Sequence, residues 1–274
     1  MKNWRPIALC NVVYKMVAKV LDNRLKGVPD KCISSSQYAF VPDRSILDNA
    51  IVAIEVIHYM KAKAKGTQGD VALKFDISKA YVRLDWEYLR DVMLQMGFSL
   101  RWVQWIMLCV ETVDYTVLVN GAQVGPFVPG RGIRQGDPLS PYLFIICAEG
   151  LSALISDAER RGVLNGSRIF TGAPSISHLL FADDCFLFFR ACEQEAMAMK
   201  NILNTYEVVS GQAINLQKFE MYCSRNTTTS CKERITQVLG VRQVLGTGKI
   251  PRPPINGWKE QKSDFQICEG SNME

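Results

Sequence analysis

Residues 178–189 read His-Leu-Leu-Phe-Ala-Asp-Asp-Cys-Phe-Leu-Phe-Phe, and this stretch decides how the rest of the chain is interpreted. Two adjacent carboxylates, Asp183 and Asp184, lie inside an apolar run, where an ionised carboxylate is costly unless something pairs with it. Each flank is too short for a helix and rich in Phe and Leu, so we predict a β-hairpin with the Asp pair at its turn. Such a turn suits a hard divalent cation such as Mg²⁺. Because Asp is a common turn residue, a plain solvated turn is the alternative from this stretch alone.

A third carboxylate, Asp76, lies near the end of an apolar stretch at residues 71–77, which we predict to be a buried strand. Five residues later comes an aromatic residue, Tyr81. Two strands that end in Asp, one of them the double-Asp hairpin, can share a pair of metal ions. Such a pair stabilises both the attacking and the leaving oxygen of a phosphoryl transfer.

The chain has 274 residues, of which 48% are apolar and 22% are charged, enough for a sizeable core. Nine Cys without a C-x-x-C pair, and only two His, argue against a zinc site and against a secreted disulfide framework. The first residues show no signal-peptide pattern, and no apolar run is long enough to span a membrane. We therefore expect an intracellular chain, nuclear or cytoplasmic, with no membrane partner.

The net charge of +5 is unevenly distributed along the chain. Residues 1–75 hold 12 Lys and Arg against 6 Asp and Glu, whereas residues 76–215 hold 11 against 15. A basic surface is typical of phosphate binding. Because the excess is modest, a solvated basic face without a partner is the alternative.

Hydrophobic spacing predicts helices at residues 11–25, 46–62, 86–96, 100–112, 138–161 and 193–210, and further strands at 115–119 and 216–224. Ser45 and Ser99 are expected N-caps, Gly211 is expected just after a helix, and Pro29 is expected to end the first helix. Asn-Gly at residues 120–121 predicts a hairpin, and residues 125–136 are expected to form a loop. The order of these elements indicates an α+β fold in which helices back one sheet.

Six blocks then follow one another in a recognisable order. They are Asn-Trp-Arg-Pro-Ile-Ala-Leu-Cys-Asn-Val-Val-Tyr-Lys (3–15), Gln-Tyr-Ala-Phe-Val-Pro-Asp-Arg (37–44), Lys-Phe-Asp-Ile-Ser-Lys-Ala-Tyr (74–81), Gly-Ile-Arg-Gln-Gly-Asp-Pro-Leu-Ser-Pro (132–141), Phe-Ala-Asp-Asp (181–184) and Ser-Gly-Gln-Ala-Ile-Asn-Leu-Gln-Lys (210–218). Together they resemble the reverse transcriptase domain of LINE-type (non-LTR) retrotransposons, of the kind abundant in plants. The last four blocks look like motifs A, B, C and D of that family.

The resemblance implies a right-hand polymerase fold, limited to fingers and palm, in which a mixed or antiparallel palm sheet is backed by helices. Residues 1–225 would form the reverse transcriptase domain. Its fingers would take about 1–75 and 113–132, and its palm about 76–112 and 133–225. Residues 226–249 would begin the connection to a thumb.

The resemblance also implies roles for the metal site. Asp76, Asp183 and Asp184 fall on the metal-binding carboxylates, and the backbone carbonyl of Ile77 would help to hold one of two Mg²⁺ ions, with Mn²⁺ as a substitute. Lys218 falls on the motif D lysine, a candidate general acid for the leaving pyrophosphate.

Further residues fall on nucleotide-binding positions of the family. Tyr81 falls on the steric gate that favours deoxynucleotides, although a core aromatic is its alternative reading. Gln135 and Gly136 fall on the segment that lines the nascent base pair, where Gly permits close backbone approach. Arg44, and also Arg5, would clamp the triphosphate, with a surface ion pair as the alternative for each.

These roles imply an RNA-directed DNA polymerase that uses an RNA template, a DNA primer 3′-OH and deoxynucleoside triphosphates. The main alternative is a catalytically inactive fragment of a degenerate retrotransposon, with at most weak nucleic-acid binding. Three departures from the family favour it, namely Asp43 in place of Gly, Val82 in place of Asp and Phe219 in place of Ser. A splicing cofactor with the same fold is a third hypothesis, which the motif wording and the lack of a basic C-terminal domain disfavour.

Residues 250–274 depart from the family altogether. After Lys249 the family continues Tyr-Leu-Gly-Leu-Pro, and one choice of codons for residues 250–257 yields that segment when the frame moves by one base. We hypothesise that these residues are an out-of-frame tail, and their Pro, Gly and polar content predicts disorder. The nucleotide sequence decides this hypothesis.

Overall fold

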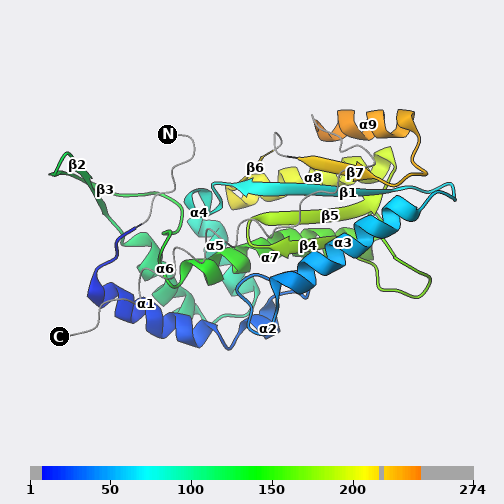
Figure 1. Ribbon diagram of the computed structural model, residues 1–274. Helices are drawn as coiled ribbons and strands as arrows, with labels where there is room; N and C mark the ends of the chain where they lie inside the picture. The colour runs from blue at the N-terminus through cyan, green and yellow to red at the C-terminus, as the bar shows by residue number, and fades with distance from the viewer. Residues whose placement is uncertain (1–7, 216–218, 242–274) are drawn as a thin grey trace, which may run out of the picture.

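The computed structural model describes residues 8–215 and 219–241, and an antiparallel sheet lies at its centre (Figure 1). The central strand β1 (Asp70–Ser78) pairs on one side with β5 (Asp184–Arg190), which pairs in turn with β4 (His178–Phe181). On its other side β1 pairs with β6 (Ala213–Ile214) and β7 (Glu220–Cys223). The predicted α+β fold with a helix-backed antiparallel sheet is confirmed.

Nine described helices and two further strands make up the rest of the fold. The helices are α1 (Val12–Leu25), α2 (Pro29–Cys32), α3 (Ile46–Ala62), α4 (Ala80–Arg83), α5 (Trp86–Gln95), α6 (Leu100–Glu111), α7 (Ser140–Arg160), α8 (Glu193–Ser210) and α9 (Thr229–Leu239). Strands β2 (Tyr115–Val119) and β3 (Ala122–Phe127) form a separate two-stranded ribbon that projects from the body (Figure 1).

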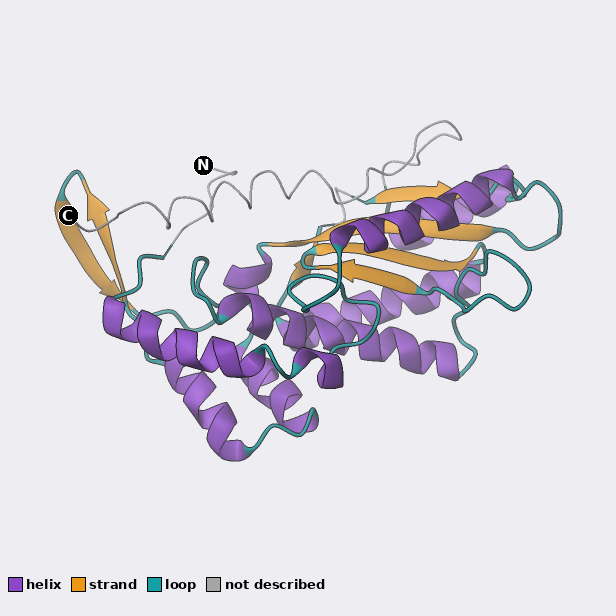
Figure 2. Ribbon diagram, turned by 60° about the horizontal axis from the view of Figure 1, so that its bottom comes forward, coloured by secondary structure: helices purple, strands orange, loops and turns teal. Residues whose placement is uncertain are grey.

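The side chains of β1 alternate between two cores, because successive residues of a strand face opposite sides of the sheet. Leu73 and Phe75 belong to the larger core, which also holds the buried faces of α7 and α8. Ala72 belongs to the smaller core, with Val56 and Met60 of α3. Helices therefore lie on both faces of the sheet (Figure 2).

Local capping signals fix several helix ends where the sequence predicts them. The side chains of Asn11, Ser45 and Ser99 accept hydrogen bonds from the first turns of α1, α3 and α6. Gly211 follows α8 at a φ of 70°, a left-handed conformation that favours glycine. The bounds predicted for α3 and α8 are those observed.

Other predicted bounds are wrong or incomplete. Pro29 follows α1 but begins the short helix α2, since its fixed φ suits a first helical turn. Strand β3 extends to Phe127, into the predicted loop, because its residues pair with β2. The sequence did not predict α4, β6 or α9. Of the strand predicted at 216–224, residues 220–223 form β7, and 216–218 lie outside the described residues, as do Arg5 and the tail at 250–274.

One described helix, α7, is long and apolar enough by length and composition to cross a bilayer. Within its most apolar window, 61% of the helix is buried inside the protein. That burial is what a central core helix shows, and α7 contributes Leu143, Phe144 and Leu151 to the larger core.

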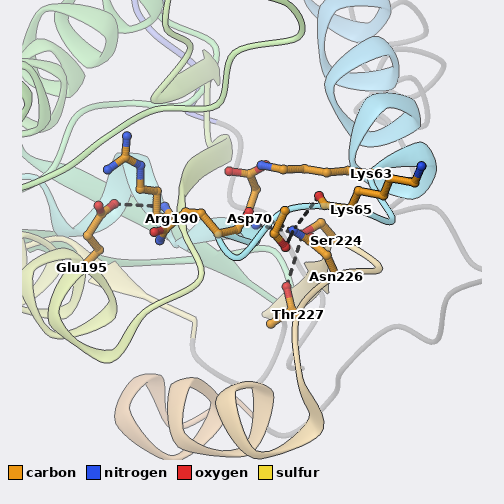
Figure 3. Close-up of polar contacts among 10 residues, drawn as sticks. Lys63, Lys65, Asp70, Arg190, Glu195, Ser224, Asn226 and Thr227 are labelled. Atoms are coloured by element: carbon orange, nitrogen blue, oxygen red, sulfur yellow. Dashed lines mark hydrogen bonds and ion pairs between the residues drawn. The ribbon is translucent and has the colours of Figure 1, made fainter.

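At the far end of β1, the loop after α3 is tied to the turn between β7 and α9 (Figure 3). The Asn226 amide nitrogen donates to three carbonyls of this loop, at 3.3 Å from Lys65, 3.1 Å from Gly66 and 2.9 Å from Gln68. A Cβ on Gly69 would lie 2.2 Å from the Thr227 hydroxyl, so the two segments touch closely. Lys63 and Asp70 close the same loop with an ion pair of 2.7 Å.

Replacing Asn226 with alanine is expected to lower the free energy of unfolding by about 1–2 kcal/mol, because one amide serves three carbonyls and water replaces only part of that bonding. Urea unfolding measures the change, and hydrogen exchange of residues 64–70 should accelerate. Asn204→Ala, on the exposed face of α8, is the matched control and should not destabilise the protein, since alanine favours helix. Equal stability of the Asn226 variant and wild type would contradict the prediction.

Candidate active site

The structure places the three predicted carboxylates at one end of the sheet. Strands β4 and β5 are joined by a two-residue turn, Ala182-Asp183, since Phe181 pairs with Asp184. In the neighbouring pairing, Asp76 of β1 lies directly opposite Asp184 of β5. The Ile77 N–H donates to the Asp183 carbonyl at 3.0 Å. Side chains of directly opposed residues in an antiparallel pair share one face, so Asp76 and Asp184 are neighbours there.

The pKa of a buried thiol next to the turn is affected by all three carboxylates. Cys185 is 1% exposed, and its Sγ lies 3.8 Å from the Asp183 carbonyl. Burial, followed by the negative charges of Asp184, Asp183 and Asp76, raises the pKa of the Cys185 thiol well above its ordinary value. The thiol is therefore neutral, and the three carboxylates lie close enough to it to contribute to the shift.

The donor chemistry of this end fits a hard divalent cation. Carboxylate oxygens, together with a backbone carbonyl such as that of Ile77, are the ligands that Mg²⁺ prefers. Within residues 8–215 and 219–241, however, no three or more His, Cys, Asp and Glu side chains gather into a group that could hold a metal ion. The structure thus brings the backbone positions of the three Asp residues together, but among the described residues their side chains do not form a complete metal-binding group.

Tyr81 lies on the single-turn helix α4, which follows Lys79 at a left-handed φ of 51°. Its half-buried ring stacks on Phe144 of α7 with the ring centroids 5.2 Å apart. Its carbonyl accepts from the Ile133 N–H at 2.7 Å, which joins α4 to the loop before α7. A Cβ on Gly132 would lie 2.6 Å from the Val82 carbonyl oxygen, so only glycine lets the loop approach α4 this closely.

Gln135 and Gly136 lie in that loop, beside a buried ionic cluster. The Gln135 carbonyl accepts from the Ala8 N–H at 3.0 Å, and Gly136 has a φ of 93°. The next residue, Asp137, is 2.9 Å from the Arg134 guanidinium and accepts from the Tyr14 hydroxyl at 2.5 Å. Burial, followed by the Asp137 charge, raises the pKa of Tyr14. The cluster fastens the loop to α1.

Arg44 directs its guanidinium into its own loop. It donates to the Ser34 carbonyl, to the Gln37 carbonyl at 2.7 Å and to the Ile33 carbonyl at 3.3 Å. Asp30 lies 3.8 Å away, so the surface ion pair of the alternative reading is also present. The proposed contact with a triphosphate is therefore additional to a structural role.

The structure does not bring every predicted residue to the hairpin, and it adds some. Lys218 lies outside the described residues, as does Arg5. Sequence reasoning missed Gln37 and Gln212, whose side chains bond to the Asp turn and to the Ala80 carbonyl beside Tyr81, respectively. Each lies inside a recognised block, but the burial of its amide and its bonding partner are visible only in the structure.

Comparison with protein families decides the ancestry of this site. The family model described as reverse transcriptase (RNA-dependent DNA polymerase) matches residues 1–243. The chain belongs to the reverse transcriptase family. All six sequence blocks, including the Asp hairpin, lie within the matched residues, so the expected membership is confirmed.

Relatives within the reverse transcriptase family include products of non-LTR retrotransposons. The chain is 29% identical over 245 residues to the transposon TX1 uncharacterized 149 kDa protein of Xenopus laevis, covering 88% of this chain and 18% of that protein. It is 27% identical over 189 residues to the Pol polyprotein of the retrotransposable element R2 from Nasonia vitripennis, covering 67% of this chain and 17% of that protein. The chain thus spans about a fifth of the length of these relatives.

A plant relative and two solved structures complete the comparison. Over 67 residues, 24% of this chain, it is 57% identical to an uncharacterized mitochondrial protein of Arabidopsis thaliana, covering 55% of that protein. Telomerase from Candida tropicalis superposes with a TM-score of 0.54 at 15% identity, in a complex with a fragment of telomeric RNA, over 76% of this chain and 33% of that one. The apo telomerase truncated from its C-terminal domain gives a TM-score of 0.52 at 16% identity, over 79% of this chain and 41% of that one. The two structural likenesses show the fold.

Proposed function

We propose that the chain is an RNA-directed DNA polymerase domain that extends a DNA primer on an RNA template with deoxynucleoside triphosphates. The observation that carries the proposal is the alignment of Asp76 opposite Asp184, beside the turn at Asp183. Asp76, Asp183 and the Ile77 carbonyl would hold two Mg²⁺ ions, with Asp184 in support. When bound, such ions neutralise charge on the attacking and leaving oxygens of phosphoryl transfer.

The other residues would take the roles that the family resemblance gives them. Tyr81 of α4, whose ring stacks on Phe144 of α7, would crowd a 2′-OH. Gln135 and Gly136 would line the nascent base pair. Arg44 would bind the triphosphate, and Lys218 would donate a proton to pyrophosphate. The division into fingers (1–75 and 113–132) and palm (76–112 and 133–225) belongs to the same proposal.

One departure from the family is accommodated by the fold. Asp43 replaces the usual Gly, and its φ is 62°, which explains why the family favours Gly there. Asp is among the residues that tolerate this conformation best, so the backbone before Arg44 keeps its path. Val82, in contrast, is 44% exposed where the family has an acidic residue, and the structure gives no compensation for it.

Asp183→Ala is expected to abolish primer extension, because losing a metal ligand costs several kcal/mol in the transition state. Each 1.36 kcal/mol is tenfold in rate, so we expect a loss of at least about 100-fold. The measurement is extension of a labelled DNA primer on an RNA template with Mg²⁺ and deoxynucleotides.

Asp157→Ala, which removes an exposed carboxylate of α7 far along the chain from the hairpin, is the matched control and should extend as wild type does. Equal extension by Asp183→Ala and wild type would overturn the proposed metal site. No extension by folded wild type would instead favour the inactive-fragment hypothesis.

A further inference from the structure

The turn that carries Asp183 adopts a conformation that its own sequence does not favour. Ala182 has a φ of 51°, in the left-handed region that costs a residue with a Cβ roughly 1–2 kcal/mol. The strand pairing ends at Phe181 and Asp184, so Ala182 lies outside the ladder. A contact to the Ala182 N–H from outside the hairpin stabilises this conformation.

The side chain of Gln37 supplies that contact. Its Oε1 accepts from the Ala182 N–H at 3.4 Å and from the Ala39 N–H at 2.9 Å. Both partners are N–H donors, so the amide orientation is determined by the contacts themselves. Its Nε2 is buried and has no hydrogen-bond partner among the described residues. The interaction with the turn therefore depends on the carbonyl oxygen of the side chain.

Gln37 is itself held firmly against the outer edge of the sheet. It is 0% exposed and forms a parallel bridge with Leu180 of β4. The Leu180 carbonyl accepts from Tyr38 N–H at 3.0 Å and from the Asn49 amide of α3 at 3.2 Å, and its N–H donates to Ser36 at 2.7 Å. The backbone of Gln37 is therefore paired with β4, which Asn49 in turn ties to α3.

The same residue also contacts the arginine assigned to the triphosphate. The Arg44 guanidinium donates to the Gln37 backbone carbonyl at 2.7 Å. On the opposite side, the Ile77 N–H holds the Asp183 carbonyl at 3.0 Å. Asp183 is thus set between β1 on one side and Gln37 on the other, and Gln37 links its turn to the Arg44 loop.

We propose that Gln37 is a positioning residue that fixes the Asp183 turn for metal binding. This inference rests on the proposed polymerase function for its metal, but its structural part can be tested without activity. Gln37→Met removes the acceptor at nearly constant volume. Gln37→Glu, which keeps an acceptor oxygen and is neutral when burial holds it protonated, should leave the turn as in wild type. Thr227→Val is the matched control, since it also removes a buried polar group, 7% exposed, but at the other end of β1, where the Thr227 hydroxyl lies 3.2 Å from that of Ser224.

The first measurement is hydrogen exchange of peptides covering residues 179–186, compared with peptides of α6 as an internal reference for global unfolding. Gln37→Met should accelerate exchange of the turn by about threefold to tenfold, as expected for loss of one hydrogen bond, without a matching change in α6. Gln37→Glu and Thr227→Val should leave the ratio of turn to α6 exchange as in wild type. If Gln37→Met does not fold, Gln37→Asn, which withdraws the acceptor by about one C–C bond length of 1.5 Å, takes its place. An unchanged exchange ratio in the acceptor-lacking variant would overturn the inference.

The second measurement is the Mg²⁺ concentration that gives half-maximal primer extension. Gln37→Met should raise it about threefold or more, whereas Gln37→Glu and Thr227→Val should leave it as in wild type. An unshifted Mg²⁺ midpoint in Gln37→Met would refute the link to metal binding. If wild type extends no primer, the proposed function fails, and the exchange result still decides whether Gln37 fixes the turn.

Discussion

Replacing Asp137 with alanine is expected to lower the free energy of unfolding by about 3–5 kcal/mol, the range found when one partner of a buried ion pair is removed. The Arg134 side chain is 11% exposed and that of Asp137 is 4% exposed, so neither charge is well solvated. Arg134 would keep its bond to the Cys109 carbonyl at 3.0 Å and its position 3.7 Å above the Tyr14 ring. Those contacts do not neutralise its charge.

The same substitution removes two further hydrogen bonds. Asp137 Oδ1 accepts from the Leu139 N–H at 3.0 Å, immediately before α7, and Oδ2 accepts from the Tyr14 hydroxyl. The start of α7 and the attachment of α1 should therefore loosen together. Urea unfolding gives the free energy change, and hydrogen exchange should show the loss in both helices.

Asp157→Ala provides a matched comparison for the Asp137 substitution. Asp157 also pairs with an arginine three residues away, but its side chain is 39% exposed and that of Arg160 is 80% exposed. Exposed pairs contribute about 0–1 kcal/mol, so this variant should change stability little. A similar small change in both variants would show that the Asp137 cluster is not the buried ion pair described.

Lowering the pH from about 6.5 to about 4 is expected to destabilise the protein through His178, by an amount on the order of 3 kcal/mol. Burial lowers the pKa of His178 to about 4 from its ordinary 6.5, although the Glu159 charge acts in the opposite direction. Both ring nitrogens bond to hydroxyls, Nε2 to Ser152 at 2.7 Å and Nδ1 to Ser177 at 3.0 Å. The folded site therefore holds a neutral imidazole.

The sign follows from which state binds the proton. Between pH 6.5 and 4 the unfolded chain protonates its histidine while the folded chain does not, so stability falls as the pH falls. Glu149, linked to Ser152 through Ser34, acts in the opposite direction, since burial raises its pKa and the folded state gains that proton first. The contribution of His178 must therefore be measured as a difference between variants.

His178→Gln isolates that contribution, because an amide can bond to both hydroxyls and does not titrate. Urea unfolding of wild type and variant across pH 4–8 should give curves whose difference changes by about 3 kcal/mol between pH 7 and pH 4. Subtraction removes Glu149 and the other carboxylates. Parallel curves for the two proteins would contradict a neutral buried His178.

Local signals in the sequence were sufficient for much of the fold. The bounds of α3 and α8 followed from Ser45 at one helix start and Gly211 at one helix end, because caps act on backbone groups within a few residues. The single turn α4 carries no periodicity to detect, and it begins after a left-handed residue, Lys79. The start of α2 at Pro29 shows that one residue type can end one helix and begin the next.

The long-range contacts that shape the site could not be predicted from local sequence signals. Gln37 lies 145 residues from Ala182, and Tyr14 lies 123 residues from Asp137. Nothing near Gln37 in the sequence indicates its partner, since the partner is set by how α3 and β4 pack. The apolar strands beside them singled out the three Asp residues and the family resemblance gave them a role, but the register that places Asp76 opposite Asp184 required the structure.

The ribbon of β2 and β3 has a consequence for handling the protein in solution. Its strands pair with no other strand of the described residues, and Leu118, Val119 and Phe127 are more than half exposed. An exposed apolar strand edge is a template for pairing with another chain. Concentrated samples of this polypeptide should therefore lose material to edge-to-edge association through the ribbon.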